Sequence, residues 1–399
     1  MILNSSIIII ALAVALYLAF SKRLRSSSSW KATVTPLASI MGSGFLISAP
    51  LLANTVGNFA VFCMALLLLL AYAVGHAIRF NIRHFEPIEH EKGTVQNIAF
   101  ISRIVLAAAY FISVTYYLQL LAAFVLKAMG VDDEMYANVI TSSLLILIGG
   151  IGVWRGLGEL EKVETYAVSL NLGMIAGLLF ALLVYNIHLL SGGEWQLPDI
   201  SSAINLDDFR VLLGLLIVVQ GFETSRYLQA EHSADERIQT MRVAQLASAV
   251  IYLLFIGLST VLFHSGLDAD VTAITNIMLP VAVVLPMLIS IAAVGSQFSA
   301  AVADTSGAGG LVQDILQHKL PVRYVYIAIT LVTVLLTWAT NVNEIIAYAS
   351  RAFALFYFIQ SLVAAILAYQ KKVMWHSVFF TLIALICFSV FMFGIPSGG

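Results

Sequence analysis

Charge is scarce in this sequence. Only 11% of the 399 residues are Asp, Glu, Lys or Arg, whereas 60% are hydrophobic. A soluble protein carries about 25% charged residues, because it needs them to cover its surface. The formal net charge is −2, so no excess of positive charge indicates binding to nucleic acid. The composition therefore excludes a soluble protein and predicts a chain embedded in a membrane.

Cysteine is nearly absent, and long polar stretches and clusters of catalytic side chains are missing. The two cysteines, Cys63 and Cys387, lie in apolar stretches, so no disulfide or metal framework is indicated. No polar stretch is long enough to build the core of a soluble domain. Charges are scattered singly through the apolar segments, and no phosphate-binding glycine motif occurs. These absences argue against an enzyme, against ATP-driven pumping and against a resident metal or cofactor.

Long hydrophobic runs are what the sequence has instead. A helix needs about 20 mainly apolar residues to cross the hydrocarbon core of a bilayer. We therefore predict an all-α integral membrane protein with about 12 transmembrane helices, and we number the first run helix zero and the others helices one to eleven. In chain order the runs are 4–20, 34–54, 58–78, 98–128, 137–153, 165–190, 209–230, 241–264, 275–302, 322–340, 344–369 and 373–394.

The first run is followed, not preceded, by positive charge, in "SKRLR". A cleaved signal peptide has its positive charge before the apolar core. We therefore expect residues 1–25 to be a retained anchor helix with its N-terminus outside. Short loops suggest a prokaryotic inner (plasma) membrane.

Lysine and arginine are distributed unevenly between the predicted loops. If the spans alternate, one side receives only Lys127 and Arg210, and the other side receives nearly all the rest. Cytoplasmic loops carry the excess of basic residues, so the loops after helices two, four, six, eight and ten are expected in the cytoplasm. The loop 191–208 is then external. The basic positions are Lys22, Arg23, Arg25, Lys31, Arg79, Arg83, Lys92, Arg155, Lys162, Arg226, Arg237, Arg242, Lys319, Arg323, Lys371 and Lys372.

Two of the predicted spans contain glycines where an unbroken helix would have its middle. Helix one carries "SIMGSGFLISAP" at 39–50, and helix six carries "QGFE" at 220–223. A broken helix in a bilayer must have its freed backbone groups satisfied within the protein or lining a cavity, and transporters use such breaks in pairs. Helix one starts inside and helix six starts outside, so the two halves have opposite topology. The alternative is that these glycines only let helices pack closely.

Four segments together resemble the amino acid–polyamine–organocation (APC) superfamily. They are "GSGFLISAP", "GLGELEKVETYAVSLNLGMIAGLL", "QGFETSRYLQAEHSADERIQTMRVAQ" and "SQFSAAVADTSGAGGLV", and the resemblance covers about residues 32–370. It implies a five-plus-five inverted repeat of the leucine-transporter type, with helices discontinuous at 39–48 and 217–225. One extra helix stands at each end, and the leading one departs from the commonest family pattern. The expected units are 1–25, 32–190, 191–208, 209–370 and 371–399.

The helix breaks suggest how a substrate would bind. Exposed amides of Ser43, Gly44 and Phe45 would form a helix N-terminus that favours a carboxylate. Freed carbonyls near Ile40–Gly42 and Val219–Gly221 would accept hydrogen bonds from an ammonium group. Together they describe a zwitterionic α-amino acid. The resemblance further implies that Phe222 is an aromatic lid over the substrate, and ordinary core packing is the alternative.

Charged residues inside spans are costly and therefore functional candidates. Glu223 would carry a proton or clamp the outer half of the site, with a salt bridge to Arg226 as the alternative. Arg351 lies seven residues after Glu344 on helix ten. We expect Arg351 to pair with an acid at an external gate or to attract an acidic substrate. The alternative is that it only snorkels outward beside Glu344.

Helices three and eight carry polar side chains that could line the cavity. Tyr110 and Ser113 share a face of helix three, although such a stripe also suits packing. Helix eight offers Ser296, Ser299, Asp304 and Thr305. Hydroxyls of helix eight and carbonyls of helix one would suit a sodium ion.

Some proton-coupled relatives have a lysine from helix five at this cation position, where this sequence has Asn171. Sodium, a proton on Glu223 and simple exchange all stay open. His76, His84 and His90 end or follow helix two. His84 and His90 lie among Glu86, Glu89 and Glu91 in a cytoplasmic loop, which we interpret as solvated and not as a metal site.

The sequence thus predicts a secondary active transporter for an amino acid or related amine, working by alternating access. An inorganic-ion or organic-osmolyte carrier on the same fold is the alternative. No metal, no nucleic acid and no cofactor is expected beyond a coupling Na⁺ or H⁺. The predicted substrate-binding residues are Ile40, Gly42, Ser43, Gly44, Phe45, Tyr110, Ser113, Gln220, Gly221, Phe222 and Glu223. The predicted gating residues are Phe222, Glu344 and Arg351, and the predicted cation-site residues are Ser296, Ser299 and Asn171.

Overall fold

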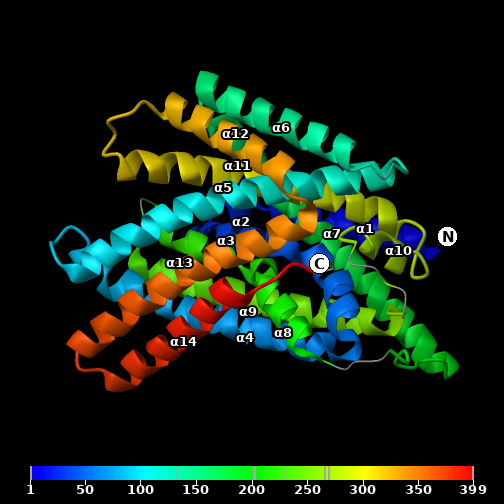
Figure 1. The fold of residues 1–399 in the computed structure, drawn as a ribbon. Coiled ribbons are helices and arrows are strands. Elements are labelled where there is room, and N and C mark those ends of the chain that lie inside the picture. Colours follow the sequence, from blue (N-terminus) through cyan, green and yellow to red (C-terminus); the bar gives the residue numbers. More distant parts are fainter. Residues whose placement is uncertain are drawn as a thin grey trace.

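Every regular element of the described chain is a helix. The computed structural model describes residues 2–131, 133–200, 204–229, 231–264, 267 and 270–397, without the side chains of Ser43 and of residues 158–165. Over these residues it contains no strand (Figure 1). The longer elements are α1 (Ile2–Phe20), α3 (Ser28–Val56), α4 (Ala60–His84), α5 (Thr94–Ala128), α6 (Glu134–Arg155), α7 (Gly158–Gly192), α8 (Leu206–Gly214), α9 (Ala234–Ser259), α11 (Leu285–Ile315), α12 (Val322–Ala339), α13 (Val342–Gln370) and α14 (Met374–Phe393).

Short helices complete the path of the chain. The four-residue helices are α2 (Lys22–Arg25) and α10 (Ile274–Ile277), and the 3₁₀ segments are η1 (Gly57–Phe59), η2 (Glu86–Ile88), η3 (Leu216–Val219), η4 (Phe222–Leu228) and η5 (Thr260–Leu262).

The membrane-spanning character of the chain is confirmed. Ten helical stretches among the described residues are long and apolar enough to cross a bilayer, and one of them, Ser28–His84, contains both α3 and α4. Separating these two helices, and adding the broken segment from α8 to η4, gives the twelve crossings that the sequence predicts. One boundary differs: the run 275–302 is not one helix, because α10 ends at Ile277 and the long helix starts at Leu285, next to Pro286.

Two halves of similar design form the core. The first half consists of α3 to α7, and the second runs from α8 through η3 and η4 to α9, α11, α12 and α13. α3 packs against α9 and against both 3₁₀ segments, while α5 packs between α11 and α13. The arrangement is the expected five-plus-five repeat, with α1 and α14 outside it (Figure 1).

The turns that follow α4, α11 and α13 meet at one end of the bundle, on the left in Figure 1. We call this the basic end, because Arg83, Lys92, Lys319, Arg323, Lys371 and Lys372 lie in these turns or next to them. The N-terminus lies at the opposite end (Figure 1).

The extra N-terminal helix α1 lies antiparallel to α7. Its small residues Ala11 and Ala15 face Gly173, where an added Cβ would lie only 2.4 Å from the carbonyl oxygen of Ala11. One turn further, Gly177 lies against Ala11 and Ile7. Two glycines spaced by four residues let two helix backbones approach closely, as in other membrane helix pairs. The sequence predicted α1 but gave no partner for it.

Two helices that start at the end opposite the basic end are capped by side chains of their own sequence. Asn341 and Glu344 form a capping box at the start of α13, and Asn205 and Asp208 form another at the start of α8. Each box satisfies two backbone N–H groups that the first turn leaves without partners. The predicted gating residue Glu344 thus has a structural role as a cap.

Candidate functional site

A cavity of about 1110 Å³ opens at the basic end and reaches the middle of the bundle. Its mouth is lined by charged side chains that include Glu86, Glu89, Arg103, Arg226 and His318. Its inner part is lined by Tyr110, Asn171, Ser296, Ser299 and Asp304. The structure therefore brings together all three predicted cation-site residues and one predicted substrate residue, from α5, α7 and α11.

A second cavity of about 790 Å³ lies at the opposite end and is lined by Lys127, Asp270 and Glu344, among others. The two cavities share no lining residue. Between them, Tyr116, Tyr117 and Phe222 are each at most 1% exposed. The protein is therefore open at the basic end and closed across its middle.

The break in α3 is narrower than the sequence suggested. Instead of an unwound stretch over 39–48, only Gly44 leaves the helical conformation, with φ 179° and ψ 12°. This φ value does not by itself require glycine. Glycine is needed here because there is no room for a side chain. A Cβ on Gly44 would lie 2.6 Å from the Cα of Val218 in η3.

The break in the second half is wider and crosses the first. Gly221 separates η3 from η4 and has φ 117°, a conformation that L side chains rarely adopt. A Cβ there would lie 2.6 Å from the carbonyl carbon of Ser39 and 2.7 Å from the amide nitrogen of Ile40. The two breaks thus touch each other at two places, a contact that the sequence did not predict.

Side chains of the protein bind the carbonyls that the breaks free. The Tyr252 hydroxyl donates to the carbonyls of Ile40, at 3.1 Å, and of Val218. The Gln297 amide donates to the carbonyl of Gly42 at 2.8 Å. Each carbonyl has a second lone pair, so a ligand ammonium could share these acceptors. Sequence analysis missed both residues. Tyr252 lies in an uninterrupted helix with no motif around it, and Gln297 lies in the quoted segment "SQFSAAVADTSGAGGLV", where only its serine neighbours were singled out.

Glu223 lies at the closed side of the break and is 1% exposed. Its Oε2 accepts hydrogen bonds from the Gly221 amide, at 3.0 Å, and from the Tyr357 hydroxyl, at 2.8 Å. The ring of Phe222 stacks on Tyr357 with a centroid distance of 5.3 Å. The salt bridge to Arg226 that the sequence left as an alternative is absent, because the Arg226 Nη1 donates to Gln360 at 2.8 Å. No basic side chain pairs with Glu223 among the residues described.

The remaining predicted substrate residues surround this closure. Phe45 packs against Phe255, with ring centroids 4.3 Å apart, and is 1% exposed. Gln220 donates to the Tyr117 hydroxyl at 3.0 Å. Ser113 donates to the carboxylate of Asp304. The side chain of Ser43 lies outside the described part of the structure.

Arg351 does not meet Glu344 or any other acid in the part of the chain that is described. Its Nε donates to the carbonyl of Phe391 in the last turn of α14 at 2.7 Å, and its guanidinium lies 5.8 Å from the Phe391 ring centroid. Arg351 therefore satisfies a carbonyl at a helix C-terminus. The acidic gate partner expected from the sequence is not present in this conformation.

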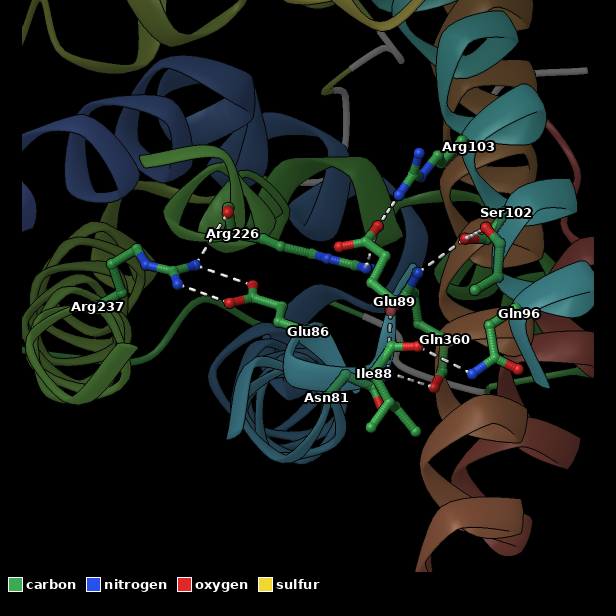
Figure 2. A network of polar contacts seen from close by, with 11 residues as sticks. Asn81, Glu86, Ile88, Glu89, Gln96, Ser102, Arg103, Arg226, Arg237 and Gln360 are labelled. Carbon is green, nitrogen blue, oxygen red and sulfur yellow. Dashed lines mark hydrogen bonds and ion pairs between the residues drawn. The ribbon is translucent and has the colours of Figure 1, made fainter. Parts of the chain in front are cut away.

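A network of charged and amide side chains borders the mouth of the cavity (Figure 2). Glu86 in η2 forms a two-pronged ion pair with Arg237 of α9, with N–O distances of 2.9 and 2.6 Å. Three residues on, Glu89 pairs with Arg103 of α5 and lies 4.0 Å from the Arg226 guanidinium. The turn after α4 is therefore tied by its two carboxylates to α5, η4 and α9.

An uncharged part of the network continues into the bundle (Figure 2). The side-chain oxygen of Gln360 accepts from both Arg226, at 2.8 Å, and Asn81, at 2.9 Å. The side-chain amide nitrogen of Gln360 donates to the Ser102 hydroxyl at 2.8 Å. Sequence analysis assigned the glutamates to a solvated loop and did not find Gln360. Their partners come from helices distant in the chain, so no local pattern marks them.

Two broken helices that cross between oppositely directed halves, beside a cavity open at one end, define an inverted-repeat membrane transporter. A family model described as "APC superfamily transporter" matches residues 22–394. The chain belongs to the APC superfamily, and it is a permease, not an enzyme.

The relatives found agree with this family. A protein of Aquifex aeolicus (strain VF5), described as uncharacterized, is 42% identical over 390 residues, which cover 95% of this chain and 94% of that protein. Two structures of a manganese transporter of Eremococcus coleocola, both mutants, are similar in fold. Their TM-scores are 0.59 and 0.60, with 13% and 14% identity, over 95% and 93% of this chain and 90% and 88% of theirs. At such identities the likeness shows the fold alone.

A methyl group at Gly44 should disturb the protein far more than one at Gly42. A Cβ at Gly44 would meet backbone atoms at 2.6 Å, whereas at Gly42 the nearest atom is 3.8 Å away. Overpacking of this kind costs roughly 1–3 kcal/mol. We expect Gly44→Ala to lower the thermal unfolding midpoint in detergent by a few degrees and Gly42→Ala to leave it unchanged. Equal midpoints would contradict the backbone contact.

The Glu89 ion pairs should stabilise the conformation that is open at the basic end. A Ser299→Cys variant reports on this state through its rate of maleimide labelling, because Cys63 and Cys387 are buried. Adding Glu89→Gln removes the negative charge that pairs with Arg103 and Arg226. Such ion pairs contribute roughly 1 kcal/mol to the stability of the conformation that contains them. We expect labelling to slow by about fivefold.

Glu91→Gln is the matched control for that experiment. Glu91 is exposed, lies two residues after Glu89 and belongs to the same turn. Labelling of the Glu91→Gln protein should match that of the parent. If Glu89→Gln also labels at the parent rate, the ion pairs do not set the conformational balance.

Proposed function

We propose that the chain is a secondary permease that carries an amino acid or a related amine by alternating access, with its basic end in the cytoplasm of a prokaryotic cell. The observation that carries the proposal is the position of the inner cavity. It places the carboxylate of Asp304 and the hydroxyls of Ser296 and Ser299 beside the segment of α3 that leads to the break. The excess of lysine and arginine in the loops at the basic end supports the proposed cytoplasmic position of that end.

The inner cavity offers complementary partners for both ends of a zwitterion. Asp304 and Tyr110 line the space that an ammonium group would occupy. The second part of α3 begins at Gly44 and presents the N-terminal end of a helix toward the same region, which favours a carboxylate. A substrate bound there would replace contacts between the crossing breaks and so bias the two halves toward a different arrangement.

We propose that transport is coupled to a proton carried by Glu223. A carboxylate that is 1% exposed and has no basic partner among the described residues is costly unless a proton or a cation neutralises it. Its bond to Tyr357 joins η4 to α13 across the closure. Loss or gain of the proton would therefore change how firmly the closure holds. A sodium ion at Ser296, Ser299 and Asn171 is the other coupling that the geometry supports.

An inorganic cation is the second candidate substrate. The manganese transporters share the fold, and the inner cavity offers oxygen ligands from Ser296, Ser299 and Asp304. Against a transition metal, no group of three or more His, Cys, Asp or Glu that could hold a metal ion occurs in the described residues. A hard cation bound by oxygens fits these residues better than a soft one.

Thermal stabilisation of the purified protein tests the substrate class. The ligands are the twenty amino acids, several amines, Na⁺ and Mn²⁺, each measured at two pH values. A ligand at about 100 times its Kd stabilises the folded state by about 2.7 kcal/mol. We expect one class of amino acid or amine to raise the midpoint, and Asp304→Asn to weaken that ligand at least about tenfold because a charge-assisted hydrogen bond is lost.

Asp314→Asn is the control, since Asp314 lines the outer part of the same cavity and pairs with His318 at 3.2 Å. It should keep the affinity of the parent. Stabilisation by Mn²⁺ or Na⁺ alone, with no response to any organic ligand, would replace the amino acid by an inorganic ion. An unchanged affinity in Asp304→Asn would remove Asp304 from the site.

Glu223→Gln tests the coupling. Glutamine keeps the size of the side chain and can accept from Tyr357, but it cannot release a proton. In proteoliposomes we expect uptake of the identified substrate to lose its response to a pH gradient, while binding of that substrate is retained. Uptake by Glu223→Gln that still follows the pH gradient would exclude Glu223 as the proton carrier.

A further inference from the structure

Basic side chains gather within the membrane-spanning part of the bundle, on the flank formed by α4, α9 and α14. His76 and Arg79 lie on α4, eight and five residues before its last residue His84, or about 12 and 8 Å along the helix. The charge of Arg242 on α9 lies near His76, and the ring of His376 on α14 is in contact with the His76 ring. The sequence placed His76 near the end of the predicted span 58–78, and the structure places it on α4, eight residues before the end of that helix.

Arg79 is the buried member of this group and is 4% exposed. It donates to the Gln245 side chain and, at 3.4 Å, to the carbonyl of Tyr72, and it lies 4.8 Å from the Tyr72 ring centroid. Neither acceptor is a carboxylate. Its Nε is buried and has no hydrogen-bond partner. The guanidinium charge is therefore not neutralised by any residue that the structure describes.

The other members are more accessible and add donors without adding negative charge. Arg242 is exposed, and it makes no ion pair or hydrogen bond within the described chain. The rings of His76 and His376 lie 5.6 Å apart, and the Nδ1 of His376 is buried without a partner. Two arginines and two histidines therefore lie on one flank, with more hydrogen-bond donors than nearby acceptors.

Uncompensated charge at this depth calls for a counter-charge. A cationic side chain within the bilayer is costly, and neighbouring arginines repel each other. Snorkelling toward water would account for exposed Arg242 alone, but it does not account for buried Arg79. Apolar side chains continue along the same flank toward the middle of the membrane, with Leu69 64% exposed and Leu246 51% exposed.

We propose that this flank binds an anionic phospholipid of the leaflet at the basic end. The phosphate of its headgroup lies against Arg242, His76 and the edge of Arg79, and its acyl chains run along Leu69 and Leu246. α4 packs against both α9 and α14, so the bound lipid bridges helices from both halves of the core and the extra helix α14 (Figure 1). Basic pockets between membrane helices on this side are known to hold anionic headgroups. A free anion lacks the apolar contacts, so the lipid is the ligand that fits the whole surface.

Native mass spectrometry of the full-length protein in detergent tests the proposal. Dioleoyl phosphatidylglycerol and dioleoyl phosphatidylcholine are added in turn, and the bound fraction of each is measured. We expect phosphatidylglycerol to be retained in preference, and Arg242→Ala to retain about fivefold less of it, the change expected for one basic residue near an anionic headgroup. Arg242→Ala should fold normally, because Arg242 is exposed and makes no ion pair.

Arg323→Ala is the matched control, since Arg323 is an exposed arginine at the same end of the bundle but on α12. It should retain as much phosphatidylglycerol as the parent. Equal retention of the two lipids, or equal loss in both arginine variants, would overturn the proposal. Stabilisation of the protein by glycerol phosphate alone would overturn it in favour of a soluble anion. His76→Gln, tested in the same way, should also lower retention and gives a second measurement at the site.

Discussion

The need to satisfy backbone polar groups inside a bilayer is the constraint on which the rest of this structure depends. Two helices are broken, and neither can turn to water for hydrogen bonds at that depth. The breaks therefore touch each other at Gly44 and Gly221, and side chains from other helices supply the missing partners. Tyr252 serves both breaks at once, and Ser350 of α13 accepts from the Ile217 amide at 2.9 Å. The crossing is thus held by helices of the second half.

The same crossing separates the two cavities, and the side chains on its two sides differ. Toward the basic end, the space beside the breaks is lined by polar side chains and is open. Toward the other end, Phe222, Tyr357 and Tyr117 fill the gap with aromatic rings and hydroxyls. Because Glu223 is bonded to both its own helix break and Tyr357, one buried carboxylate connects the site to the closure. This connection is the reason for our proposal that protonation of Glu223 is coupled to transport.

Charge is used sparingly, and the ion pairs around the open cavity lie at one end of the molecule. Glu86 and Glu89 of the turn after α4 are paired with arginines from three other elements, and these pairs frame the open cavity (Figure 2). A short distance away, on the outer flank of α4, Arg79 and Arg242 have no carboxylate among the described residues. The charges that frame the cavity mouth are therefore paired within the protein, whereas Arg79 and Arg242 on the flank have no such partner among the described residues. This contrast suggests that the lipid composition of the membrane affects the same helices that border the cavity.

The sequence alone determined the helical class, the membrane location, the paired breaks and the family, because hydrophobic run length and glycine position are local properties of the chain. It also placed Ser296, Ser299, Asn171 and Tyr110, which the structure gathers around one cavity. Only the tertiary structure decided that Arg226 bonds Gln360 instead of Glu223, and that Arg351 caps α14 instead of meeting an acid. It also supplied Tyr252 and Gln297 as partners of the broken backbone. These pairings join residues far apart in the chain, and their choice depends on which helices lie side by side, which no local sequence pattern records.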